Sequence, residues 1–158
     1  MNITVISVGK IKEKYFTAAI DEYSKRLSRF AKLNIIEVAD EKIPDNASEK
    51  EMEQIKEKEG NKILAKLPQN SFVVTLCIEG KEYSSEELAK KIADISMTSS
   101  HITFIIGGSL GLSDTVKSKS VLRLSFGKMT LPHQLMRVVL LEQIYRAFKI
   151  KNNESYHK

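Results

Sequence analysis

The residues with the clearest chemical potential lie in three short segments in the second half of the sequence. In the first segment, Gly107, Gly108 and Gly111 follow directly on the apolar run Ile102–Ile106. Glycine accepts positive φ angles and lets a ligand approach the backbone closely, so this turn is a candidate binding loop. A tight turn without a ligand explains the same residues, because glycine is common in turns of every function.

The second segment is the connection Gly127–Pro132, in which the apolar residues Met129 and Leu131 stand in an otherwise polar loop. Apolar side chains in a loop must pack either beneath it or against a bound aromatic group. A loop tucked under the next helix, whose start Pro132 fixes, is the alternative to a binding loop.

The third segment is the chain end, where Tyr156, His157 and Lys158 follow one another. An aromatic ring or an imidazole can stack on a base while a lysine holds a phosphate, so these residue types suit RNA recognition. Chain ends commonly fray, and a tail without a role is the competing interpretation.

Several other kinds of site are excluded by the residues present. Ser109 replaces the second glycine of the dinucleotide-binding pattern G-x-G-x-x-G, and the turn lacks the lysine of a phosphate-binding P-loop. The three histidines are far apart in the sequence, and the single cysteine, Cys77, lies within an apolar segment. The sequence therefore predicts no metal site, no disulfide and no cysteine nucleophile.

The distribution of charge points to a polyanionic partner. Residues 115–158 contain nine Lys or Arg against two Glu, whereas the rest of the chain is slightly acidic. A basic segment favours binding to nucleic acid, and a solvated basic surface without a partner is the alternative. No apolar run reaches the roughly 20 residues of a membrane span, and there is no signal peptide pattern. We therefore expect a soluble, cytoplasmic protein without a membrane partner.

Alternating strand and helix patterns position these segments. Runs that are continuously apolar or apolar at every second residue predict strands, and apolar residues three or four apart predict helices. The expected strands are Ile3–Val8, Leu33–Val38, Phe72–Ile78, Ile102–Ile106 and Val121–Phe126, and the expected helices start near Tyr15, at the capping boxes Ser48–Glu51 and Ser84–Glu87, at Ser113 and near Leu135. This order predicts one α/β domain over residues 1–158 with a mainly parallel sheet, whose strand ends bring the loops after Leu76, Ile106 and Phe126 to one edge.

The last expected helix, about Leu135 to Phe148, is apolar around most of its circumference. The final helix of a small domain normally keeps one wet face. We therefore expect its extra apolar face to meet a second copy of the chain in a two-fold dimer. Cover by residues 40–68 is the alternative.

Three stretches together resemble the small SPOUT-class ribosomal RNA methyltransferases: FIIGGSLGLS (104–113), LSFGKMTLPHQLMRVVLLEQIYRAFKI (124–150) and the terminal Tyr156–His157. The likeness is closest to the large-subunit methyltransferase H family, which methylates N3 of a pseudouridine in 23S rRNA on the assembled ribosome. It extends from ITVISVGKIKEKY (3–15) to the chain end. The resemblance implies a mainly parallel sheet with helices on both faces, a C-terminal trefoil knot over about residues 71–158, a homodimer and S-adenosylmethionine as methyl donor.

The resemblance also implies which residues form the site. It places the methyl donor against Leu76, Gly108 and the loop Gly127, Lys128, Met129, Thr130, Leu131 and Pro132. Tyr156 and His157 are expected near the target base. Some relatives carry Arg after this Tyr–His pair, where the present chain has Lys158, which keeps the positive charge and loses the planar fork of arginine.

Catalysis is expected to depend mainly on aligning the methyl donor with its acceptor, and on help in removing the N3 proton of pseudouridine. His157 is the first candidate for this base and His133 the second, while Arg137 and Lys158 are expected to stabilise negative charge or to hold phosphate. Further expected rRNA contacts are Arg146, Lys149 and Lys151. Because the tail is short, we expect the tail of one protomer to reach the donor pocket of the other.

Two other functions are compatible with these features. A SPOUT methyltransferase that acts on tRNA or on another rRNA site differs only in its substrate. A non-catalytic ribosome-binding factor keeps the fold and differs in failing to take up the methyl donor.

Overall fold

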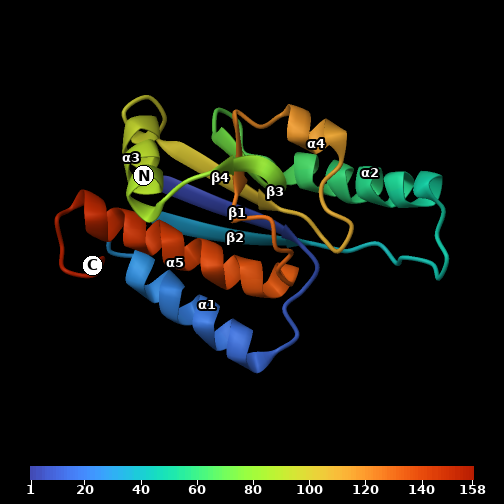
Figure 1. Ribbon diagram of the computed structural model, residues 1–158, viewed down its shortest axis with the longest axis horizontal. Coiled ribbons are helices and arrows are strands. Elements are labelled where there is room, and N and C mark those ends of the chain that lie inside the picture. Colours follow the sequence, from blue (N-terminus) through green and yellow to red (C-terminus); the bar gives the residue numbers. More distant parts are fainter.

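The computed structural model describes residues 1–158 as alternating strands and helices (Figure 1). The strands are β1 (Asn2–Val8), β2 (Lys32–Val38), β3 (Phe72–Glu82), β4 (His101–Ile106) and β5 (Leu122–Ser125). The helices are α1 (Lys14–Leu27), α2 (Glu49–Lys66), α3 (Ser85–Ser96), α4 (Asp114–Ser118) and α5 (His133–Lys151). The order of strands and helices predicted from the sequence is confirmed.

The five strands form one sheet with the order β2-β1-β4-β3-β5, and every pair in it is parallel. In β1, Ile3 and Val5 contribute to the core on one face of the sheet, and Ile6 and Val8 to the core on the other. Burial on both faces is typical of parallel sheets and explains the continuous apolar runs. Because the strands are parallel, all of their carboxyl ends lie at the same edge.

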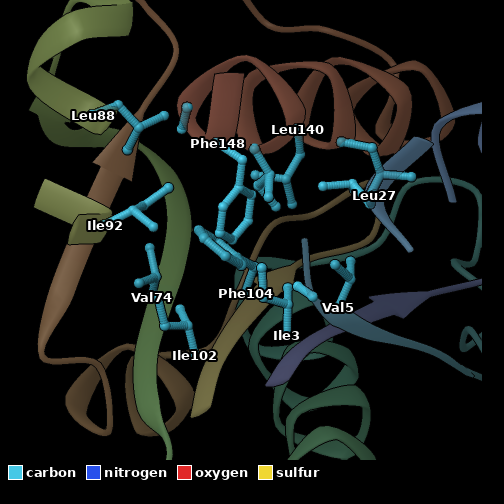
Figure 2. Packing of buried hydrophobic residues seen from close by; sticks show 14 of the residues in the cluster. Ile3, Val5, Leu27, Val74, Leu88, Ile92, Ile102, Phe104, Leu140 and Phe148 are labelled. Carbon is cyan, nitrogen blue, oxygen red and sulfur yellow. The ribbon is translucent and has the colours of Figure 1, made fainter. Parts of the chain in front are cut away.

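Helices cover both faces of the sheet, as predicted. The larger core lies between the sheet and α1, α3 and α5; Figure 2 shows Leu140 and Phe148 of α5 above Phe104 of β4. The smaller core joins the opposite face to α2 and α4 through Ile63 and Val116. Within the first layer, α5 packs against both α1 and α3.

The packing of α5 contradicts one alternative drawn from the sequence. Residues 40–68 supply α2, which lies on the opposite face of the sheet, so they do not cover α5 (Figure 1). The buried side of α5 faces α1, α3 and the sheet instead. Leu135 and Val139 of α5 belong to neither core and stay half-buried. These two side chains are available to a second protein surface.

β3 differs from the prediction in its length. It was expected to end at Ile78, but it continues to Glu82, and its pairing with β5 shifts register between Leu76 and Lys81. Gly80 makes this possible, since a Cβ at that position would lie 2.7 Å from the carbonyl oxygen of Arg123. The irregularity is a bulge of the kind that re-aims side chains near functional sites.

The chain crosses the carboxyl edge of the sheet before it enters α5. β5 pairs only with β3, at the sheet edge, whereas α5 starts next to Gly9, at the end of β1. The connecting loop therefore passes over the ends of β3 and β4. Such a return is compatible with the trefoil knot expected over about residues 71–158, which stays a prediction.

Both predicted capping boxes are confirmed. Ser48 Oγ accepts a hydrogen bond from the Glu51 amide, and the Glu51 carboxylate accepts one from the Ser48 amide. Ser84 and Glu87 make the same pair of bonds at the start of α3. Each box satisfies two amides that the helix itself cannot pair.

Ser48→Ala is expected to lower the free energy of unfolding by about 1 kcal/mol, because the Glu51 amide loses its acceptor. Chemical denaturation measures this change. Ser24→Ala is the matched control, since Ser24 lies within α1 and its side chain makes no hydrogen bond. The control should keep or slightly raise the stability. Equal losses in the two variants would contradict the contribution of the capping box.

Candidate functional site

A cavity of about 370 Å³ lies at the carboxyl edge of the sheet. Three segments that are far apart in the sequence form most of its wall: residues 76–79 of β3, the glycine turn 107–112, and Phe126 with Met129, Thr130 and Leu131. The three segments predicted to converge do so, but only two of them are loops, because the residues after Leu76 remain within β3. The volume lies within the range of small-molecule sites.

The structure brings together most of the residues expected to hold the methyl donor. The cavity wall includes Leu76, Gly108, Met129, Thr130 and Leu131. Gly127 lines a neighbouring hollow of about 220 Å³, which shares Phe126 with the cavity. Lys128 and Pro132 line neither space.

The loop 127–132 is not simply tucked under α5. Met129 is 85% exposed and Leu131 is 37% exposed. Large apolar side chains that remain this exposed beside a cavity are typical of a surface that meets a ligand or partner. The alternative of a loop packed beneath its own helix is therefore wrong for Met129.

The glycine turn is closed tightly by its own backbone. The Gly111 amide donates a hydrogen bond to the Gly108 carbonyl at 3.0 Å. A Cβ on Gly107 would lie 2.8 Å from the carbonyl carbon of Gly111, and Gly111 itself has a φ of +86°. The turn needs glycine for its own geometry, and it also forms one wall of the cavity.

His133, the first residue of α5, also lines the cavity. Burial lowers the pKa of its imidazole; the positive charge of Arg137 lowers it further, and Asp40 opposes this shift. A lowered pKa favours the neutral imidazole at neutral pH, which is the form that can accept a proton. The position of His133 is therefore compatible with its expected role as a base.

Arg137 occupies a different place from the one its expected role requires. Its side chain is buried, and its Nη1 donates to Oε2 of Glu37 at 2.6 Å. Its Nη2 donates to the carbonyl oxygens of Val8 and Gly9, at 2.9 and 2.7 Å. Because the guanidinium does not line the cavity, its position does not support direct contact with substrate charge. Arg137 instead joins α5 to the ends of β1 and β2 through these hydrogen bonds.

The chain end packs beside the carboxyl-terminal half of α5. The Tyr156 hydroxyl donates to Oε2 of Glu142 at 2.8 Å. The His157 ring lies between Arg146, with Nδ1 3.2 Å from Nη1, and Glu86, with Nε2 2.7 Å from Oε1. Since an α-helix rises 1.5 Å per residue, Arg146 lies about 20 Å along α5 from the cavity end of the helix. The tail and the cavity of one chain are thus well separated.

The side chains expected to contact rRNA differ in exposure and in whether they form ion pairs. Arg146 pairs with Glu142 at 2.7 Å, and Lys149 pairs with Glu154 at 2.6 Å. Lys151 and Lys158 are exposed. Sequence reasoning missed Glu142, although its spacing of four residues from Arg146 on one helix is a recognisable sign of an ion pair.

Three further findings concern metal binding, the Cys77 thiol and membrane spans. No group of three or more His, Cys, Asp or Glu side chains is placed to hold a metal ion. Burial raises the pKa of the Cys77 thiol, which disfavours its thiolate. None of the helices is both long enough and apolar enough for a membrane span.

The fold and the cavity define an α/β protein with a small-molecule site at the carboxyl edge of a parallel sheet, and comparison with known proteins identifies its family. Residues 1–157 match the family model described as "Predicted SPOUT methyltransferase". The chain belongs to the SPOUT methyltransferase family.

Similar proteins include full-length relatives. Two of them are named "Ribosomal RNA large subunit methyltransferase H": the protein of Clostridioides difficile (strain 630) is 60% identical to this chain, and that of Clostridium novyi (strain NT) is 62% identical. Each alignment covers 100% of both chains. A solved structure, "a probable methylase family protein from Haemophilus influenzae Rd KW20", superposes with a TM-score of 0.53 at 14% identity over 99% of this chain and 70% of that one. This last likeness supports the fold alone.

Arg137→Met is expected to lower the free energy of unfolding by about 2 kcal/mol, because the Val8 and Gly9 carbonyls lose their donor in a buried place. Chemical denaturation measures the loss. Arg123→Met is the control, since Arg123 is exposed on β5 and its side chain reaches only the Lys117 carbonyl, at 3.5 Å. Unchanged stability of Arg137→Met together with lost activity would contradict the structural role and favour a catalytic one.

Proposed function

We propose that this protein is an S-adenosylmethionine-dependent methyltransferase that modifies N3 of a pseudouridine in 23S rRNA on the assembled ribosome. The observation that carries the proposal is the cavity formed by Leu76, the glycine turn and the loop 127–132. It occurs in a SPOUT family member whose full-length relatives are named for ribosomal RNA methylation.

The cavity residues fit the methyl donor. Exposed Met129 and Leu131 offer apolar contacts to an adenine ring, and the glycine turn offers a backbone that a ligand can approach. In this proposal Leu76, Gly108 and residues 127–132 hold the donor. The bound donor supplies a reactive methyl group on its sulfonium, so the protein's main task is to orient the reactants and to exclude water.

The residues of this chain also offer two candidates for the base that removes the N3 proton. His157 is the first, with Tyr156 beside it at the target nucleotide, and His133 is the second. His133 borders the cavity, and its lowered pKa keeps the ring neutral. In either case an imidazole nitrogen takes the proton, and a nearby cation such as Lys158 stabilises the developing negative charge. For His157 this requires the ring to leave Arg146 or Glu86, which contact its two nitrogens in the single chain.

The separation of tail and cavity supports a shared site. In a two-fold dimer with antiparallel α5 helices, the carboxyl end of one α5 lies near the amino end of the other, which brings the partner's His157 toward the cavity. Leu135 and Val139 on α5 are apolar and belong to neither core of the single chain, so they suit this contact. The complete site then requires two copies of the chain.

The basic carboxyl-terminal quarter supplies contacts to rRNA phosphates in this proposal. Lys151 and Lys158 are exposed, and Arg146 and Lys149 lie nearby in ion pairs with Glu142 and Glu154. Contacts of this kind make the affinity for RNA fall steeply as the salt concentration rises.

Transfer of labelled methyl groups identifies the substrate. Ribosomes from cells that lack this gene should accept the label, whereas free 23S rRNA and tRNA should accept much less, and mass spectrometry should locate the new methyl group on one pseudouridine. Preferred labelling of tRNA would favour another SPOUT activity. Absence both of labelling and of donor binding in calorimetry would favour a non-catalytic ribosome-binding factor.

Mixed dimers test whether the site is shared. A chain that ends at Ser155 lacks the tail, and Leu131→Arg alters the donor cavity. Each variant alone is expected to be inactive, whereas an equal mixture after subunit exchange should regain about a quarter of the wild-type activity, since half of the dimers then hold one complete site. No recovery in the mixture, with dimers present, would mean that each tail serves its own cavity.

A further inference from the structure

A second recess continues the donor cavity along the same edge of the sheet. It has a volume of about 270 Å³ and lies over the ends of β1 and β2, where Val8 and Asp40 line it. Gly108, Ser109 and His133 line both spaces. The two spaces are therefore direct neighbours along this edge.

The floor of this recess contains a buried carboxylate. Glu59 of α2 is 5% exposed, and its Oε2 accepts a hydrogen bond from the Glu41 amide at 3.0 Å. Its Oε1 accepts no hydrogen bond and lies 3.3 Å from the position that a Cβ on Gly108 would take. One oxygen of a nearly inaccessible charged group thus faces the recess without a partner.

The surrounding residues compensate this charge only in part. Burying a carboxylate is costly unless it is paired and fully hydrogen-bonded. The nearby cation Lys62 contacts Glu41 at 2.9 Å and the Ala39 carbonyl at 3.1 Å, and it forms no ion pair with Glu59. Burial raises the pKa of Glu59, and Asp40 adds to the shift, while the Glu41 amide and Lys62 oppose it. A cationic group placed in the recess would give the free oxygen of Glu59 a partner.

The rim carries charges of both signs. Asp40 is exposed and makes no hydrogen bond or ion pair, and Lys42 lines the same recess. Acidic groups beside a lysine suit a small zwitterion, whose ammonium approaches the carboxylates and whose own carboxylate approaches the lysine. The end of S-adenosylmethionine that lies opposite its adenine is an amino acid with these two charges.

We propose that the recess binds the amino-acid end of the methyl donor and that Glu59 accepts a hydrogen bond from its ammonium group. This inference rests on the proposed function, because it assigns the second half of the same ligand. Holding the donor at both ends fixes the orientation of the sulfonium between them, so Glu59 is a positioning residue. A purely structural Glu59 would need only the bond to the Glu41 amide, which glutamine can also accept.

Calorimetry with three ligands tests this assignment without turnover. S-adenosylhomocysteine has the whole amino-acid end, its desamino analogue lacks the ammonium, and 5′-methylthioadenosine lacks the entire end. Glu59→Gln is expected to weaken binding of S-adenosylhomocysteine by roughly 10- to 100-fold, the effect of one charge-assisted hydrogen bond. Binding of the other two ligands should change by less than about twofold.

Two further variants control the experiment. Glu57→Gln is the matched control, since Glu57 lies on the same helix and accepts hydrogen bonds from the Thr115 hydroxyl outside the recess; it should leave all three affinities unchanged. Asp40→Asn removes an exposed charge at the rim without breaking a bond, and a loss of a few-fold for S-adenosylhomocysteine alone is expected. This variant keeps the test decisive if Glu59→Gln fails to fold.

The outcomes distinguish the assignment of the recess from the proposed function. Unchanged binding of S-adenosylhomocysteine by Glu59→Gln would overturn the assignment, and so would equal weakening of all three ligands, which would make Glu59 a structural residue. Both results leave the proposed function standing. Failure of the wild-type protein to bind any of the three ligands would overturn the proposed function and the recess with it.

Discussion

The buried guanidinium of Arg137 fixes the geometry on which the rest of the site depends. It joins the second turn of α5 to the carbonyl groups at the end of β1 and to Glu37 of β2. These bonds determine where α5 begins relative to the sheet. The loop 127–132 must then cross the ends of β3 and β4 to reach that point, and His133 comes to lie at the cavity wall. The charged side chain of Arg137 thus contributes by positioning α5 and the loop before it.

The length of α5 divides the site in two. Its amino-terminal end borders the cavity, whereas its carboxyl-terminal end holds Tyr156 and His157 through Glu142 and Arg146. A rigid helix keeps these two groups apart in one chain, so a site that uses both requires a second copy. In this proposal, residues of two chains form each catalytic site. The small size of the chain is compatible with a large ribosomal substrate.

The charges at the carboxyl edge are arranged in two zones. The cavity over β3 and β4 is lined mainly by apolar side chains and backbone, and its charged Lys117 and Glu79 pair with each other at 2.6 Å. Glu59, Asp40 and Lys42 line the recess over β1 and β2, where Asp40 and Glu59 form no ion pair. Gly108 and Ser109 of the glycine turn line both zones, and a Cβ on Gly108 would lie 3.3 Å from Oε1 of Glu59. A ligand with an aromatic end and a zwitterionic end matches this division.

The sequence by itself determined the alternation of strands and helices, the capping boxes and two of the three predicted edge loops, because apolar periodicity and cap residues act over a few neighbouring positions. The sequence also predicted the position of the glycine turn correctly, because three glycines directly follow the apolar run of β4. Only the tertiary structure decided the bulge in β3, the burial of Arg137 and the unpartnered oxygen of Glu59. Each of these depends on backbone groups of distant segments, such as the Arg123 carbonyl opposite Gly80 and the Val8 carbonyl opposite Arg137. Whether a polar side chain is exposed, paired or left facing a ligand follows from what the fold places around it, and local sequence patterns do not contain that information.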